Sequence, residues 1–109
     1  MINKSKHLLH QKQADFLKAL SHPFRIAIVD FLKDGEQCVC DIADHIQAER
    51  SNVSRHLAVM VNAGIISFRK DGLKVLYTLE TPCVLEFLGC INQVIKQQLK
   101  QSQQLLRAV

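Results

Sequence analysis

The chain has 109 residues, of which 48% are hydrophobic and 22% are charged. This length supports one modest hydrophobic core, and the composition excludes wholesale disorder and collagen-like repeats. No apolar stretch approaches the roughly 18 to 20 residues of a membrane-spanning helix, and the polar segment 1–13 lacks the apolar core of a signal peptide. We therefore expect a single domain over residues 1–109, in the cytoplasm and without a membrane partner.

Four helices are expected in the first part of the chain. Apolar residues three apart in 14–20 predict the first helix. Pro23 is typical of a first helical position, so a second helix begins there with Ser21 or His22 as its cap, and it ends before Asp34-Gly35. Apolar residues spaced three or four apart in 39–46 and 53–61 predict the third and fourth helices, and Gly64 ends the last of them.

A hairpin and a final helix follow. The runs 65–68 and 74–79 are β-branched and aromatic, and Asp71-Gly72 between them is a strong hairpin signal. From Pro82 to Leu99 the apolar residues recur every three or four positions, which predicts a long helix. The order is ααααββα, mainly α with a small β-hairpin. The last apolar stripe is longer than one small core can cover, so we expect a homodimer that buries it.

The third helix, a break at 47–49 and the fourth helix have the form of a helix-turn-helix, and the hairpin would be its wing. Five basic side chains face only two acidic ones between residues 49 and 74. A recognition helix reads base edges with its first turns, and a wing contacts phosphate or the minor groove, so the expected partner is double-stranded DNA. The candidate DNA contacts are Arg50, Ser51, Asn52, Ser54, Arg55 and His56 in the helix and Arg69, Lys70 and Lys74 in the hairpin.

Helical periodicity limits how many of these side chains can reach the groove. Ser51, Asn52, Ser54, Arg55 and His56 cannot all face the same side, and we expect about three of them to do so. The alternative for His56 is a structural position between the helix and the hairpin.

Four segments resemble the ArsR/SmtB family of winged-helix repressors, which respond to metals, metalloids or thiol chemistry. They are ALSHPFR at 19–25, EQCVCDIA at 36–43, SNVSRHL at 51–57 and AGII at 63–66, followed by the hairpin through Tyr77. The resemblance implies a dimeric operator-binding repressor rather than an enzyme, with the first and last helices at the dimer interface. Glu49 stands where the family usually has serine, and an acid there is expected either to weaken phosphate binding or to cap the helix.

Cys38 and Cys40 are the sharpest chemical signal. Four cysteines in a chain without an export signal indicate reduced thiols for metal or redox chemistry. Two thiolates two residues apart can hold a soft ion, although in a regular helix they point apart and converge only at a distorted helix terminus. We expect As(III), Sb(III) or a soft divalent metal as the inducer, with Asp41 as a further ligand candidate and no cofactor required for folding.

The resemblance leaves the third ligand open. Family sensors often have a third cysteine where Ala43 stands, so the third donor would be Cys83, Cys90, a thiol of the partner subunit, a small-molecule thiol, or His7 or His10. Of the four positions of the family's zinc site on the last helix, Thr81, Cys83, Val94 and Gln97, only Cys83 could coordinate. Cys83 and Cys90 are two helical turns apart, so they cannot share one ion within a regular helix, and both could instead be buried structural thiols.

Three alternatives compete with a metal-released repressor. The same cysteines would also suit a repressor that responds to thiol oxidation or persulfide. A constitutive DNA-binding module would leave the cysteines inert. A thiol enzyme is disfavoured because the sequence has no Cys-x-x-Cys in a βαβ pattern, no Ser/His/Asp arrangement and no phosphate-loop motif.

Overall fold

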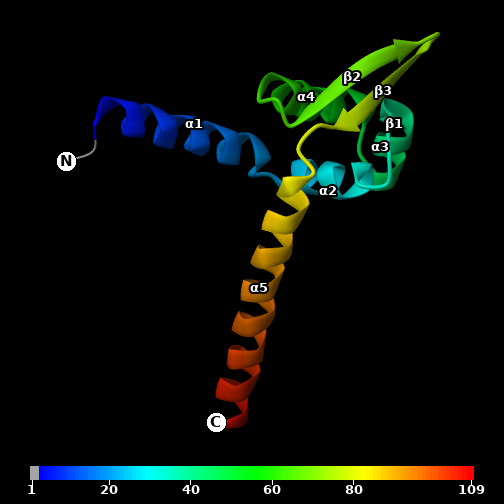
Figure 1. The fold of residues 1–109 in the computed structure, drawn as a ribbon. Helices are drawn as coiled ribbons and strands as arrows, with labels where there is room; N and C mark the ends of the chain where they lie inside the picture. The colour runs from blue at the N-terminus through cyan, green and yellow to red at the C-terminus, as the bar shows by residue number, and fades with distance from the viewer. Residues whose placement is uncertain (1–2) are drawn as a thin grey trace.

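The computed structural model describes residues 3–109, which form five helices and a small antiparallel sheet (Figure 1). The elements are α1 (Lys4–Leu20), α2 (Pro23–Leu32), β1 (Gln37–Cys38), α3 (Val39–Ile46), α4 (Arg50–Asn62), β2 (Ile66–Asp71), β3 (Lys74–Leu79) and α5 (Cys83–Arg107). This is a winged helix-turn-helix, and the predicted fold class is confirmed. None of the helices described here is both long and apolar enough to cross a bilayer.

The start of α2 and the ends of α3 and α4 lie at the residues that the sequence indicates. Pro23 occupies the first position of α2, and the ring nitrogen Nδ1 of His22 accepts from the backbone N–H of Phe24 and caps the helix. Gln47, with a φ of 61°, ends α3 in the left-handed conformation and makes the tight turn to α4. Gly64, with a φ of 79°, ends the turn after α4, where a side chain would be strained.

The sheet has a third strand that the predicted order ααααββα omits, and in this detail the prediction was wrong. Strand β1 pairs antiparallel with β3, with Gln37 opposite Tyr77 and Cys38 opposite Leu76. The strand order is therefore β1-β3-β2. Two residues are too short to show an alternating pattern, and their pairing depends on a strand some forty positions later in the sequence.

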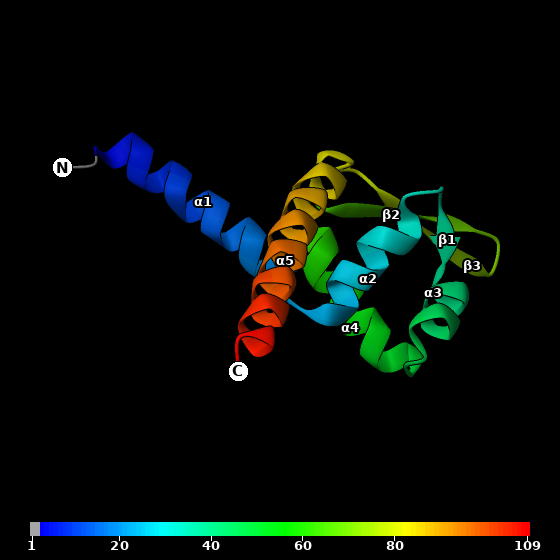
Figure 2. The same ribbon diagram turned by 90° about the horizontal axis from the view of Figure 1, so that it is seen from below.

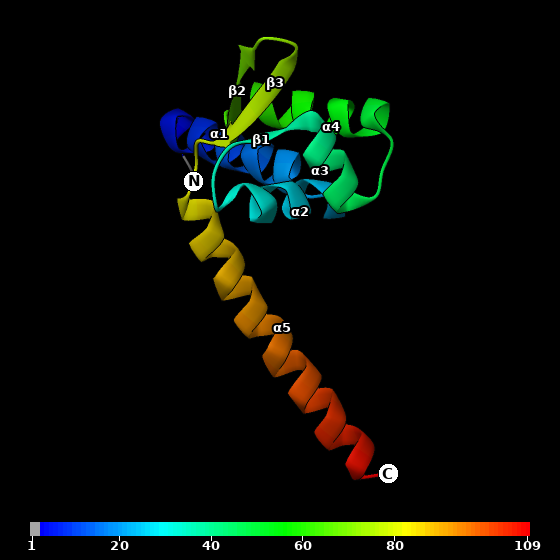
Figure 3. The same ribbon diagram turned by 90° about the vertical axis from the view of Figure 1, so that its right-hand side faces the viewer.

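The core lies between α2, α3, α4 and the base of the hairpin. Its fully buried members are Ile28, Val29, Ile42, Val53, Leu57, Met60 and Ile65. α3 packs against both α2 and α4, so the helix that begins with the cysteine segment braces the fourth helix directly. The hairpin of β2 and β3 extends away from this core as the wing (Figures 1 and 3).

α1 and α5 project from the core in different directions (Figures 1 and 2). The radius of gyration is 17.5 Å, whereas a compact chain of this length would have about 13 Å. Large apolar side chains remain exposed on both helices: Leu8, Leu9 and Leu17 on α1, and Phe87, Ile91, Val94, Ile95 and Leu99 on α5. A single copy of the chain therefore leaves its longest apolar stripe uncovered.

Candidate DNA interface and cysteine site

The first turns of α4 expose part of the predicted DNA-contacting set. Arg50, Ser51, Ser54 and Arg55 are exposed, and the last three share one helix face. Asn52 is half-buried and its Oδ1 accepts from Nη2 of Arg55 at 3.4 Å. Glu49 is the residue before the helix, but its side chain makes no capping hydrogen bond. The exposed face of the first two turns of α4 is thus polar and carries no acid.

His56 points inward rather than with that exposed face. Its ring lies 4.2 Å from the ring of His22 and 5.5 Å from that of Phe24, measured between centroids. Nε of Arg25 donates to Nδ1 of His56 at 3.1 Å, while Nη1 of Arg25 donates to the carbonyls of Lys18 and Ala19 at the end of α1. Arg25 therefore ties α1, α2 and α4 together. His56 packs against the start of α2, not against the hairpin.

Acid should weaken the fold through this cluster. Burial lowers the pKa of His56 below its ordinary value of 6.5, and the nearby charges of His22, Arg25 and Arg55 lower it further. Because the unfolded chain then binds the proton more readily than the folded one, this contribution to stability is complete above pH 6.5 and declines below it. We expect the free energy of unfolding to fall between pH 7.5 and pH 5.5, measured by urea denaturation at one fixed protein concentration.

His56→Gln should reduce that decline, because glutamine keeps an acceptor for Arg25 and takes up no proton. His10→Gln, on the exposed face of α1, is the matched control and should leave the pH dependence as in the wild type. Equal pH dependence in His56→Gln and the wild type would contradict the assignment to this cluster.

At the wing tip Lys70 and Lys74 form no ion pair with any residue of 3–109, whereas Arg69 is paired. Lys70 and Lys74 are exposed where β2 turns into β3, whereas Arg69 forms a bidentate ion pair with Glu36, Nε to Oε2 at 3.0 Å and Nη2 to Oε1 at 2.6 Å. This pair lowers the pKa of Glu36, chiefly through the hydrogen bond from Arg69. Of the three predicted wing contacts, Lys70 and Lys74 are therefore available to bind a phosphate, whereas Arg69 is held by Glu36.

Cys38 and Cys40 converge at the start of α3. Cys38 has an extended backbone and caps the helix, with its Sγ accepting from the N–H of Asp41 at 3.3 Å, while Cys40 lies within the first helical turn. Their sulfurs are joined as a disulfide, with the Cα atoms 5.4 Å apart, so for this pair the structure differs from the expected reduced thiols. Because Cys38 is extended rather than helical, its side chain does not point away from that of Cys40, as it would in a regular helix. When reduced, the pair would present two adjacent sulfurs.

Asp41 completes a group of three potential ligands. One donor atom from each of Cys38, Cys40 and Asp41 lies within 4.8 Å of the others, the one such group among residues 3–109. Cys38 is buried, Cys40 is half-buried and Asp41 is exposed, so the group opens to solvent on the carboxylate side. Two soft donors and one hard donor fit a thiophilic divalent ion, and the two sulfurs alone can hold As(III) with oxygen as its third ligand.

The other predicted ligands do not join this group. Cys83 and Cys90 are exposed on α5 in one copy of the chain, so neither is buried within its own domain. His7 and His10 lie on the exposed face of α1. Ala43, in place of a third cysteine, is buried in the core.

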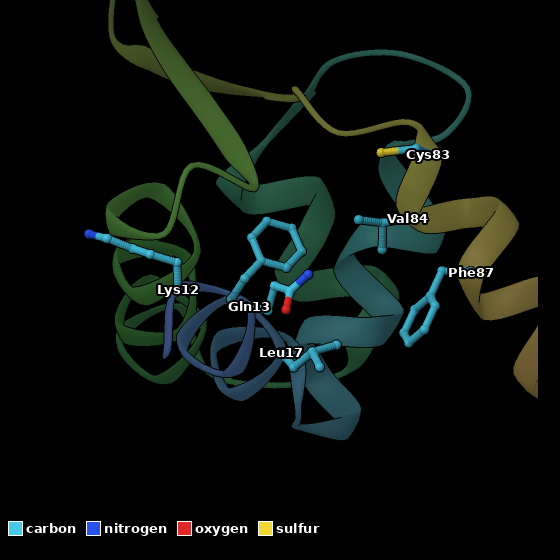
Figure 4. A pocket seen from close by; sticks show the side chains of 7 residues that line it. Lys12, Gln13, Leu17, Cys83, Val84 and Phe87 are labelled. Carbon is cyan, nitrogen blue, oxygen red and sulfur yellow. The ribbon is translucent and has the colours of Figure 1, made fainter. Parts of the chain in front are cut away.

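A groove between α1 and α5 lies beside Cys83 (Figure 4). It has a volume of about 550 Å³ and an apolar floor that includes Phe16, Leu17, Val84 and Phe87. Lys12 extends away from the other labelled side chains. The groove belongs to the same uncovered apolar surface as the stripe on α5.

Two residues important to these sites were not among the sequence candidates. Arg25 lies in one of the motifs that carry the family resemblance, but nothing in its spacing indicates a bond to His56. Glu36 begins another of these motifs, but nothing in the sequence indicates its partner, because Arg69 is 33 residues away.

The sequence and the fold match known transcriptional regulators. Residues 22–67 match the family described as bacterial regulatory protein, arsR family. The arsenical resistance operon repressor of Staphylococcus xylosus is 37% identical over 84 residues, which cover 77% of each chain. A cadmium resistance transcriptional regulatory protein CadC homolog of Staphylococcus aureus is also 37% identical, covering 72% of this chain and 69% of that protein.

A solved structure agrees with these relatives. NolR from Sinorhizobium fredii superposes with a TM-score of 0.78 at 26% identity, covering 86% of this chain and 94% of its own. The matched family segment runs from the cap of α2 through α4 into β2, and so includes both the cysteine pair and the helix-turn-helix. The chain therefore belongs to the ArsR family of bacterial transcriptional regulators.

Proposed function

We propose that this protein is a homodimeric repressor that binds operator DNA and is released from it by a thiophilic ligand at Cys38 and Cys40. The ligand is As(III), Sb(III) or a soft divalent metal ion. The observation that carries the proposal is the convergence of the two sulfurs at the start of α3, which packs directly against α4. The names of the relatives, which refer to arsenical and cadmium resistance, support this class of ligand.

The DNA-binding surface in this proposal consists of α4 and the wing. Ser51, Ser54 and Arg55 on the exposed face of α4 would meet base edges or phosphate, with Arg50 beside them, and Lys70 and Lys74 would contact phosphate at the wing tip. Asn52 would act through Arg55, and His56 would hold α4 against α2. The single domain of residues 1–109 would pair with a second copy through α1 and α5, whose apolar faces are exposed in one copy.

Ligand binding would act on DNA affinity through α3. The reduced thiols of Cys38 and Cys40 each lose a proton to a hydroxide of As(OH)₃, two As–S bonds form and two water molecules leave. In the structure the two sulfurs are bonded to each other, so an ion bound between the reduced sulfurs fixes a different spacing between the capping residue and the first helical turn. Because α3 braces α4, this local change shifts the population away from the DNA-competent arrangement.

Anisotropy of a fluorescent copy of the protein's own promoter tests this function. The fully reduced protein, bound to that DNA under anaerobic conditions, is titrated with arsenite, antimonite and Cd²⁺ in turn. We expect release at about one equivalent per protomer for at least one of these ligands, since each protomer has one such pair of sulfurs. No release by any of them, but release by a disulfide-forming oxidant or a persulfide donor, would replace the proposal with the thiol-redox alternative.

A further inference from the structure

One carboxylate connects both strands of the wing to the segment that carries the cysteines. Glu36 immediately precedes β1, and its two oxygens accept from Nε and Nη2 of Arg69 on β2 at 3.0 and 2.6 Å. Oγ1 of Thr78 on β3 donates to the same carboxylate at 3.4 Å. Glu36 thus spans the sheet, and we refer to Glu36, Arg69 and Thr78 as the carboxylate clamp.

The strand register places the clamp beside the cysteine site. Cys38 lies opposite Leu76 of β3, and Leu76 lies opposite Arg69 of β2, so the three residues form one row across the sheet. Glu36 is only two residues from Cys38. The cysteine segment is therefore attached to the wing twice, by the backbone pairing of β1 with β3 and by the clamp.

We propose that Glu36 and Arg69 are positioning residues that hold the wing in its DNA-binding orientation and transmit the ligand state of Cys38 and Cys40 to it. This inference rests on the proposed function and adds a second route, through the sheet, to the one through α3 and α4. A bidentate guanidinium–carboxylate pair depends strongly on geometry. A ligand that changes the spacing between Cys38 and Cys40 moves the backbone of β1, shifts Glu36 relative to Arg69, and loosens the wing.

The clamp also changes the role expected of Arg69. If Arg69 were mainly a phosphate contact, Glu36 would compete with the DNA for it, and Glu36→Gln would raise operator affinity and steepen its salt dependence. If Arg69 positions the wing through Glu36, the same substitution lowers affinity and leaves the salt dependence unchanged. The two roles therefore predict opposite signs for one substitution.

The test compares Glu36→Gln, Arg69→Gln and the double variant with the wild type. Operator affinity is measured by anisotropy at several salt concentrations, with and without saturating arsenite. We expect each single substitution to lower ligand-free affinity by about two- to fivefold, the range of a partly exposed ion pair. The double variant should be no weaker than either single one, and the ratio of affinities without and with arsenite should fall in all three variants.

Glu80→Gln is the matched control. Its carboxylate accepts from Oγ of Ser67 across the same two strands, at the opposite end from the wing tip, and it has no hydrogen bond to the segment before β1. It should retain wild-type affinity and arsenite response. Because the exchanged side chains are partly exposed and lie outside the core, circular dichroism should show the same fold in every variant.

Three outcomes overturn the inference: higher affinity in Glu36→Gln, additive losses in the double variant, or an unchanged arsenite ratio. If the wild type itself is not released by arsenite, the proposed function fails for that ligand and the clamp transmits no signal from it. The ligand-free affinities still decide separately whether the clamp positions the wing.

Discussion

Replacing Cys38 and Cys40 together with serine should abolish release from the operator by thiophilic ligands. The hydroxyl of serine is not ionised near neutral pH and is a poor ligand for soft ions, so the site loses both of its soft donors. Ligand-free operator affinity should stay within about twofold of the wild type, because serine is among the best helix caps and can accept the N–H of Asp41 as the sulfur of Cys38 does. The measurement is the arsenite titration of the protein–promoter complex by anisotropy.

Cys83→Ser with Cys90→Ser is the control for this experiment. Both thiols are exposed on α5 and neither belongs to the ligand group at the start of α3. This variant should respond to arsenite at the same concentration as the wild type. Loss of DNA binding in the Cys38/Cys40 variant would mean that the pair is structural. Loss of the response in the control would place the third ligand on α5.

The order of the helices and the hairpin, and the position of the cysteine pair, could be predicted because their signals are local. Pro23, the break at 47–49, Gly64 and Asp71-Gly72 each impose a backbone geometry on their immediate neighbours. The same is true of the requirement that Cys38 and Cys40 lie at a helix terminus, since it follows from helix geometry alone. The structure places Cys38 at that terminus, in an extended conformation.

The features that the sequence does not predict depend on contacts between distant segments. Strand β1 exists because β3 offers it an edge, and Glu36 is fixed by an arginine on another strand. His56 has the same polar character as the exposed residues of α4, and only the approach of His22 and Phe24 from α2 turns it into a packing residue. Periodicity shows which residues share a helix face, but not what packs against that face.

Charges placed on the apolar face of α5 should separate the dimer and remove most of its operator affinity. Ile91 and Ile95 are 37% and 46% exposed in one copy, and burying an unpaired carboxylate at each position in both copies is strongly unfavourable. A monomer contacts only one half-site, so we expect Ile91→Asp with Ile95→Asp to lower operator affinity by at least about 100-fold. Sedimentation equilibrium measures the dimer, and anisotropy measures the affinity.

Gln93→Asp with Gln97→Asp adds the same charge on the opposite face of α5, because each position is two residues from an apolar one. This control should remain a dimer with nearly wild-type affinity.

Arg55→Ala should change DNA binding without changing the dimer, since Arg55 is exposed on α4, far in sequence from α1 and α5. It should remain dimeric yet bind the operator more weakly and with a shallower salt dependence. If the Ile91/Ile95 variant is a dimer with full operator affinity, the apolar face of α5 is not the dimer interface. If it is a monomer that binds the operator weakly, pairing through this face is required for tight DNA binding.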